Sequence, residues 1–161
     1  MKTALRLVLI TIFFFVVYWT SYPENRTETD DGYEYAIAVK SLPYGDIFLN
    51  RCLLFQPFAK FCYDALNNAG IKTDAYQLLC SLSCLFSSLS LALINFLLSK
   101  YLKISPLSAV IGTVLTGFSY GFWRYATEAD LYPMATFMIL LVFIFFMKWY
   151  EREDFFILLT T

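Results

Sequence analysis

The sequence predicts an all-α protein, a polytopic membrane helix bundle with four transmembrane helices and amphipathic interfacial helices in the first outer loop. Of its 161 residues, 59% are hydrophobic and only 16% are charged, whereas soluble domains carry about a quarter charged residues. The apolar residues are gathered into uncharged runs long enough to cross a bilayer. The net charge of -1 gives no electrostatic case for nucleic-acid binding. The sequence has no histidine, which excludes Ser-His, Cys-His and zinc-His chemistry.

Four segments are expected to cross the membrane within a single domain, 1–161. The first is apolar from Leu7 to Trp19, and no small-x-small cleavage site follows it, so it is interpreted as an uncleaved anchor. The second has no charge over the 23 residues from Tyr76 to Leu98, which as a helix extend roughly 35 Å. The predicted spans are 5–20, 76–98, 104–123 and 131–149.

The basic residues predict the orientation of these spans. They fall in three groups on one side of the membrane, and the positive-inside rule makes that side cytoplasmic, together with both termini. The outer loop 21–75 and the short loop 124–130 then face the non-cytoplasmic side. We expect an integral membrane protein, with a bacterial inner (plasma) membrane as the favoured location. The three groups are Lys2 with Arg6, Lys100 with Lys103, and Lys148 with Arg152.

The outer loop is too long for a simple connection. Residues 32–42 are typical of a short helix opened by an aspartate. Residues 48–66 mix large apolar and charged side chains, which favours amphipathic helices in the membrane interface, and Pro57 should break or bend them. At the other end, the charged "EREDF" is followed by an apolar run too short to span. We expect this run to be the start of a fifth helix that has been cut off.

The first group of acids is Asp30, Asp31 and Glu34, directly after the first span. One interpretation is structural: Asp31 at a helix N-cap, with Glu34 three residues later, resembles a capping box. The other is functional, because a helix N-terminus also positions a carboxylate. Both interpretations stay open, since one side chain can serve both purposes.

The second group lies in "FWRYATEADLYPM", residues 122–134. Arg124 and Glu128 are four residues apart and would share a helical face. Glu128 and Asp130 are two apart and would point in different directions on a helix, so one of them is expected to face a common site. The structural alternative is a solvated loop that caps two helices. Interfacial aromatic residues are expected near the ends of spans, but acids beside them are not explained in that way.

Both acidic groups are predicted to lie on the same side of the membrane. Carboxylates there can act as a general base or hold a divalent cation such as Mg²⁺ or Mn²⁺, and no residue is assigned as a metal ligand. A positively charged side chain nearby can pair with a phosphate leaving group. The candidates for that role are Arg124, Lys40 and Arg51.

Two stretches, "DDGYEYAIA" and "GFWRYATEADLYPMATFMILLVFIFF", resemble the N-terminal part of GT-C superfamily membrane glycosyltransferases. They are most similar to the DUF2723-type and related protein O-mannosyltransferase-like families. There, a tryptophan followed by Ala-x-x-Glu-x-x-Tyr opens the fourth helix. The matching positions are Trp123, Ala126 or Ala129, Glu128 and Tyr132.

The resemblance implies sugar transfer from a polyprenyl-phosphate donor to an acceptor hydroxyl or amine on the outer side. Asp31 would then be the base or the group that orients the acceptor, and Glu128 a second carboxylate, with Asp30, Glu34 and Asp130 in reserve. The alternative is a non-enzymatic four-helix membrane scaffold or subunit, which is distinguished by whether the two acidic groups converge. A coupled transporter is less favoured, because the last three predicted spans contain no Asp, Glu, Lys or Arg before Lys148, which closes the fourth.

Overall fold

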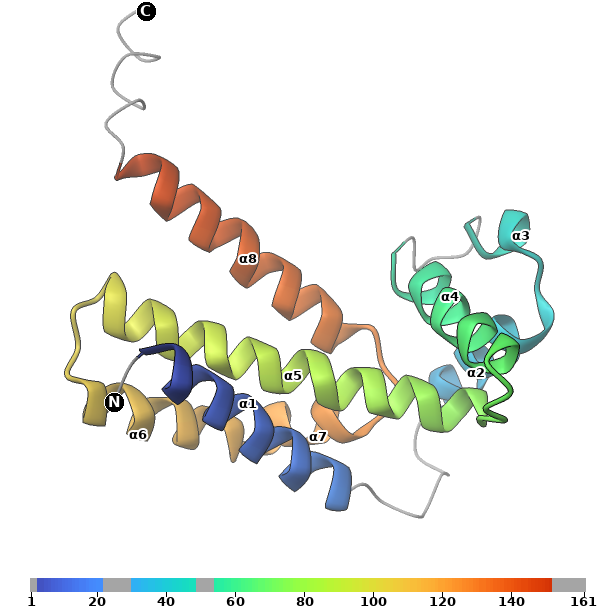
Figure 1. The fold of residues 1–161 in the computed structure, drawn as a ribbon, viewed down its shortest axis with the longest axis horizontal. Helices are drawn as coiled ribbons and strands as arrows, with labels where there is room; N and C mark the ends of the chain where they lie inside the picture. Colours follow the sequence, from blue (N-terminus) through green and yellow to red (C-terminus); the bar gives the residue numbers. More distant parts are fainter. Residues whose placement is uncertain (1–2, 22–29, 49–53, 152–161) are drawn as a thin grey trace, which may run out of the picture.

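A computed structural model describes residues 3–21, 30–48 and 54–151, except for the side chains of Asp30 and Phe48. This part of the chain forms helices joined by turns and short loops, without strands, so the predicted all-α fold class is confirmed (Figure 1). The helices are α1 Thr3–Thr20, α2 Asp30–Ser41, α3 Tyr44–Phe48, α4 Phe55–Asn68, α5 Ala75–Lys100, α6 Pro106–Gly117, α7 Tyr120–Thr127 and α8 Tyr132–Tyr150.

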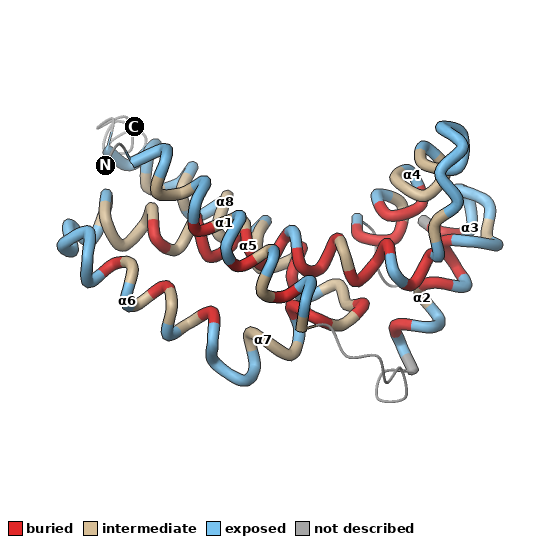
Figure 2. Tube along the Cα trace, turned by 60° about the horizontal axis from the view of Figure 1, so that its bottom comes forward, coloured by how far each residue is buried: buried red, intermediate tan, exposed pale blue. Residues whose placement is uncertain are grey.

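Helix α5 is the centre of the bundle. It packs against α1, α6, α7 and α8, and its first turns also contact α2 and α4. Within its most apolar window 56% of the residues are buried, against 11% in the corresponding windows of α1 and α8. Figure 2 shows the same contrast, with buried residues concentrated along α5. The outer faces of α1 and α8 are apolar and exposed, as expected of helices that face lipid.

Three of the described helices, α1, α5 and α8, are long and apolar enough to cross a membrane. The predicted third span, 104–123, differs from the structure because it is divided between α6 and α7. Helix α6 has 12 residues and ends at Gly117, so it extends only about 18 Å. The Tyr18 hydroxyl donates a hydrogen bond of 2.8 Å to the carbonyl of Gly117, and so satisfies an acceptor that the end of a helix leaves free. The predicted count of four spans is not confirmed.

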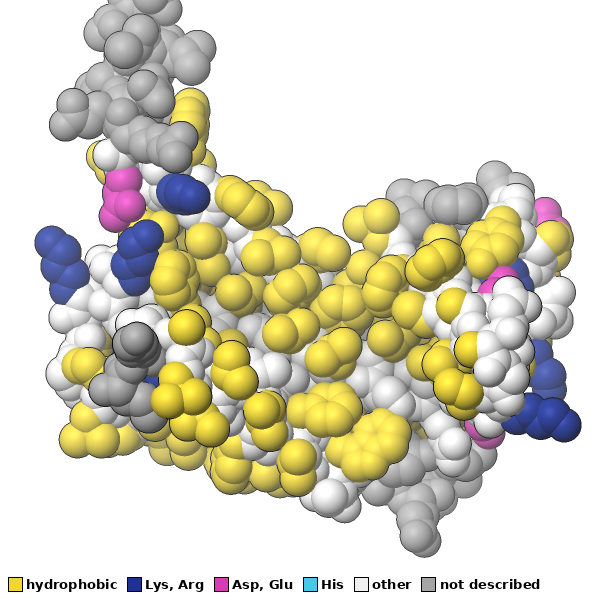
Figure 3. Space-filling model, viewed as in Figure 1, with side chains coloured by type: hydrophobic (Ala, Val, Ile, Leu, Met, Phe, Trp, Pro, Cys, Tyr) yellow, Lys and Arg dark blue, Asp and Glu magenta, His cyan; other side chains and the backbone are white. Residues whose placement is uncertain are grey.

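The basic residues at the helix ends gather at one end of the bundle. Helices α1 and α5 run antiparallel, and Arg6 Nη2 donates to Ser99 Oγ at 2.9 Å. Lys100 and Lys103 follow at the same end, where α8 also ends with Lys148. Hydrophobic side chains cover the middle of one face, and charged ones lie towards its two ends (Figure 3). The orientation of this arrangement in a membrane stays a prediction.

Helices α2, α3 and α4 form a unit at the opposite end of α5 (Figure 1). The predicted helix at 32–42 corresponds to α2. In the segment 48–66, α4 begins at Phe55 and places Pro57 in its first turn, where proline is better tolerated than in a helix interior. Lys60 is buried, donates to the Val39 carbonyl at 3.2 Å and lies 3.7 Å from Asp64. The hydrogen bond to Val39 joins α4 to α2, whereas the contact with Asp64 lies within α4.

Candidate active site

The two acidic groups of the sequence lie at the same end of the bundle, opposite the basic cluster (Figure 1). Asp31 lies in the first turn of α2, and the ring of Tyr33 stacks on Tyr76 at the start of α5, with centroids 5.0 Å apart. Asp130 lies in the loop between α7 and α8. Ser83 of α5 holds that loop, because its hydroxyl donates to the Asp130 carbonyl at 3.2 Å and accepts from the Asp130 amide at 3.3 Å. Both acids are thus fixed relative to the first half of α5.

Asp130 and Asp31 are close enough to interact electrostatically. Burial raises the pKa of the Asp130 carboxyl above its usual value, and the negative charge of Asp31 raises it further. Two backbone hydrogen bonds act in the opposite direction, since Asp130 Oδ1 accepts from the amides of Leu131 at 2.6 Å and Tyr132 at 3.4 Å. The acid that the structure brings towards Asp31 is therefore Asp130, which the sequence had placed in reserve.

Glu128 is paired with Arg124. Arg124 lies in the last turn of α7, Glu128 follows directly after the helix in an extended conformation, and Arg124 Nε donates to Glu128 Oε1 at 3.1 Å. The Glu128 side chain is only 12% exposed, whereas that of Arg124 is 40% exposed. The carboxylate of Glu128, followed by contact with Tyr120, raises the pKa of the Arg124 guanidinium. Glu128 is thus held against its cation, and the exposed part of Arg124 can meet an anion.

In the described part of the chain, the structure does not bring the other predicted site residues of the outer loop into contact with Asp130 or with the Arg124–Glu128 pair. Because α2 begins at Asp30, Asp31 lies within its first turn and not at the N-cap position that a capping box requires. Asp31 and Glu34 are both exposed, and Lys40 lies in the last turn of α2, about 14 Å from Asp31 along the axis. Arg51 and the side chain of Asp30 lie outside the described part of the chain.

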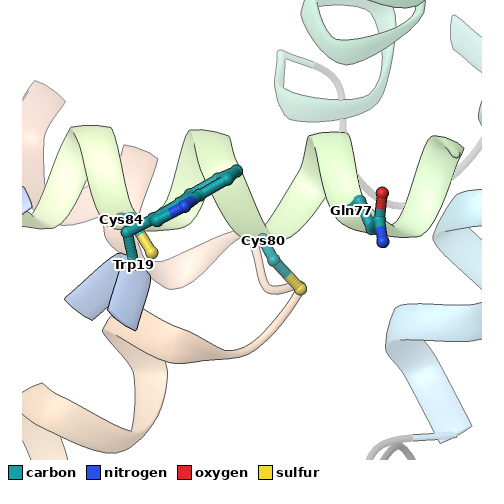
Figure 4. A pocket seen from close by; sticks show the side chains of 4 residues that line it. All are labelled: Trp19, Gln77, Cys80 and Cys84. Atoms are coloured by element: carbon teal, nitrogen blue, oxygen red, sulfur yellow. The ribbon is translucent and has the colours of Figure 1, made fainter. Parts of the chain in front are cut away.

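A cavity of about 170 Å³ lies between the end of α1 and the first half of α5 (Figure 4). Its walls include Trp19, Gln77, Cys80 and Cys84. The two cysteines share a face of α5, as their spacing predicts, and Ser83, which holds the acidic loop, lies between them in the sequence. The loop passes beside Cys80 in the close view. The cavity therefore adjoins the acids.

Sequence reasoning predicted the acids but missed the residues that position them. Ser83, Trp19 and Gln77 lie within or beside predicted spans, where apolar character is the dominant signal. The available clue was the number of serines in the segment 76–98, which is unusual for lipid-facing surface. Among the described residues, no group of three or more Cys, Asp or Glu side chains is placed to hold a metal ion.

Comparison with known proteins gives one family match. Residues 52–157 match the family model described as "Protein O-mannosyl-transferase TMEM260 N-terminal domain". The match covers about two thirds of the chain, including α4 to α8 and the loop that bears Glu128 and Asp130. Asp31 lies before the matched segment. No curated protein and no solved structure matches the chain significantly.

Proposed function

The chain belongs to the protein O-mannosyl-transferase TMEM260 N-terminal domain family, and from this membership we propose that it is the N-terminal part of an integral-membrane glycosyltransferase. It takes a sugar, in this family mannose, from a polyprenyl-phosphate-linked donor. It transfers the sugar to a protein hydroxyl on the non-cytoplasmic side. The observation that supports the proposal is that Asp31 and Asp130 lie at the same end of the bundle and interact electrostatically, with the Arg124–Glu128 pair in the segment that leads to Asp130.

In the proposed reaction, the oxygen of the acceptor hydroxyl attacks the anomeric carbon of the donor sugar. The bond between that carbon and the phosphate oxygen breaks, and the phosphate keeps the electron pair. Asp31 accepts the hydroxyl proton, a role that suits an exposed carboxylate at the start of a helix. Asp130 is the second carboxylate and orients the acceptor.

Arg124 stabilises the phosphate that leaves. A guanidinium recognises phosphate oxygens through paired N–H donors, and it keeps its charge at every physiological pH. Glu128 fixes the position of the guanidinium through its hydrogen bond with Nε, so the remaining N–H groups are oriented before the donor arrives. Glu128 is thus a positioning residue in this proposal.

The test is Asp31→Asn in the full-length protein. We expect sugar transfer to fall by about 10²–10⁴-fold, the usual contribution of a general base, with unchanged insertion into the membrane. Asp46→Asn is the matched control, because Asp46 is also an exposed acid of the outer segment but lies in α3. Transfer that survives in Asp31→Asn, or that falls equally in both variants, removes the base role from Asp31.

A further inference from the structure

The cavity beside the acids has one aromatic wall. Trp19 is the penultimate residue of α1, which ends at Thr20, and its indole stacks on Phe15, at 6.0 Å between centroids and 19° between planes. In Figure 4 the indole is seen nearly edge-on, with one of its faces turned towards Cys80. The contact with Phe15 supports the indole, which offers flat apolar ring surface to a ligand.

The remaining walls combine polar and apolar groups. Gln77 is exposed and offers one acceptor and two donors, whereas Cys80 and Cys84 are buried and present small apolar surfaces. The volume of about 170 Å³ is below the range of about 300–1,000 Å³ that drug-sized ligands occupy. A single six-membered sugar ring has this combination of properties. Its axial C–H groups form an apolar face that suits the negative face of an indole, and its hydroxyls need hydrogen-bond partners.

We propose that this cavity holds the hexose ring of the donor, stacked on Trp19 and hydrogen-bonded by Gln77. The assignment rests on the proposed function and adds to it the place of the sugar. Ser83 fixes the Asp130 loop within one helical turn of Cys80 and Cys84 on α5, so a ring in the cavity lies beside the acids. The lipid phosphate then extends away from the sugar towards the exposed side of Arg124.

The same cavity fits an isoprenoid chain poorly. Such a chain is long and lacks hydrogen-bonding groups, whereas the cavity has a volume of only about 170 Å³ and includes the Gln77 amide. A second cavity, of about 200 Å³, lies between α5, α7 and α8. Its tyrosines 125 and 132 pack edge to face against each other, at 5.0 Å between centroids and 67° between planes, so they offer a sugar less open ring surface than Trp19 does.

The first test measures binding without turnover. Trp123→Phe and Trp149→Phe together leave Trp19 as the only indole of the 161 residues, and Trp19→Phe with Trp123→Phe leaves Trp149, at the basic end of the bundle, as the control. The probes are a mannosyl phosphate on a short isoprenyl chain and the same isoprenyl phosphate without sugar. We expect only the mannosylated probe to change the emission of Trp19, and neither probe to change that of Trp149.

An equal response of Trp19 to both probes identifies a lipid site and overturns the proposal. The absence of a response to either probe also overturns it.

The second test is kinetic. Trp19→Leu should raise the KM for the donor about three- to tenfold, the range expected for one aromatic stacking contact, while Trp19→Phe keeps most of the affinity. Trp149→Leu, which removes an interfacial indole elsewhere, should leave KM unchanged. An unchanged KM in Trp19→Leu also contradicts the assignment.

The two proposals fail separately. If Asp31→Asn abolishes transfer while the emission of Trp19 does not respond to the mannosylated probe, the glycosyltransferase proposal stands and the sugar subsite is wrong. If Trp19 responds only to the mannosylated probe while Asp31→Asn keeps full activity, the subsite stands and the base is another group.

Discussion

Replacing Gly117 by alanine tests the physical explanation of the break between α6 and α7. A Cβ atom at Gly117 would meet Phe14 Cε1, and it would lie 2.6 Å from Phe14 Cζ and 2.9 Å from Leu91 Cδ1. Ordinary van der Waals contacts begin at 3.4 Å. The Phe14 ring would therefore have to retreat by at least about 0.8 Å, the difference between 3.4 and 2.6 Å.

The ring has little room to retreat. Phe14 is 1% exposed and packs against the rings of Phe13, Tyr18 and Phe118, with centroids 5.1, 5.6 and 5.6 Å away. Forcing an extra methyl group into a packed core costs about 1–3 kcal/mol. We expect Gly117→Ala to lower the free energy of unfolding by that amount, because neither the rings nor the helix end can move freely.

The measurement is reversible unfolding of the protein in detergent or bilayers, with Gly121→Ala as the matched control. No atom lies within 4 Å of a Cβ at Gly121, which is inside α7. Alanine there should be neutral or stabilise by up to about 1 kcal/mol, because it has the higher helix propensity. If Gly117→Ala is as stable as Gly121→Ala, the approach of Phe14 and Leu91 to Gly117 does not exclude a side chain at this position.

Two further changes test the polar contacts of the bundle. Thr113→Val should lower the free energy of unfolding by about 0.6–1.7 kcal/mol, because it removes the hydroxyl that accepts from buried Asn95 at 3.1 Å. Thr116→Val is the control, since the Thr116 hydroxyl donates to the Gly112 carbonyl within α6, and an equal loss in both variants would refute a role for the contact between helices. At neutral pH, the unfolding midpoint of Asp130→Asn should be at least as high as that of the wild type. Any gain in the midpoint should vanish as the pH falls towards 4. The pKa of Asp130 is raised in the folded state, so its stabilising contribution is complete below the unfolded pKa and is lost as the pH rises through the folded one; a variant that is less stable at neutral pH would contradict this sign.

Helix identity and the main spans could be predicted from the sequence because long uncharged apolar runs have few alternatives in a membrane. The predicted spans at 5–20, 76–98 and 131–149 each correspond to one long helix. The segment 104–123 is also uncharged, yet it is divided between α6 and α7. Composition could not reveal the break, since it depends on how closely α6 approaches Phe14 and Leu91, residues distant in the sequence.

The candidate site shows the same division between local and distant information. The spacing of four residues predicted that Arg124 and Glu128 lie together, and the structure contains this pair, although Glu128 lies just beyond the end of α7. Which acid approaches Asp31 could not be predicted, because it depends on the Ser83 bonds that set the path of the α7–α8 loop. Periodicity along one segment says nothing about contacts across 47 residues of sequence.

The break between α6 and α7 links the packing of the spans to the site. A continuous helix from 106 to 127 would extend about 33 Å and carry Arg124 along the axis of α6. Because α6 ends at Gly117, α7 is a separate helix that begins at Tyr120 and packs against both α1 and α5. Tyr18 holds the helix end from α1, and Ser83 holds the acidic loop from α5. The same two helices supply Trp19 and Gln77 to the cavity, so the parts that position the acids also form the proposed sugar subsite.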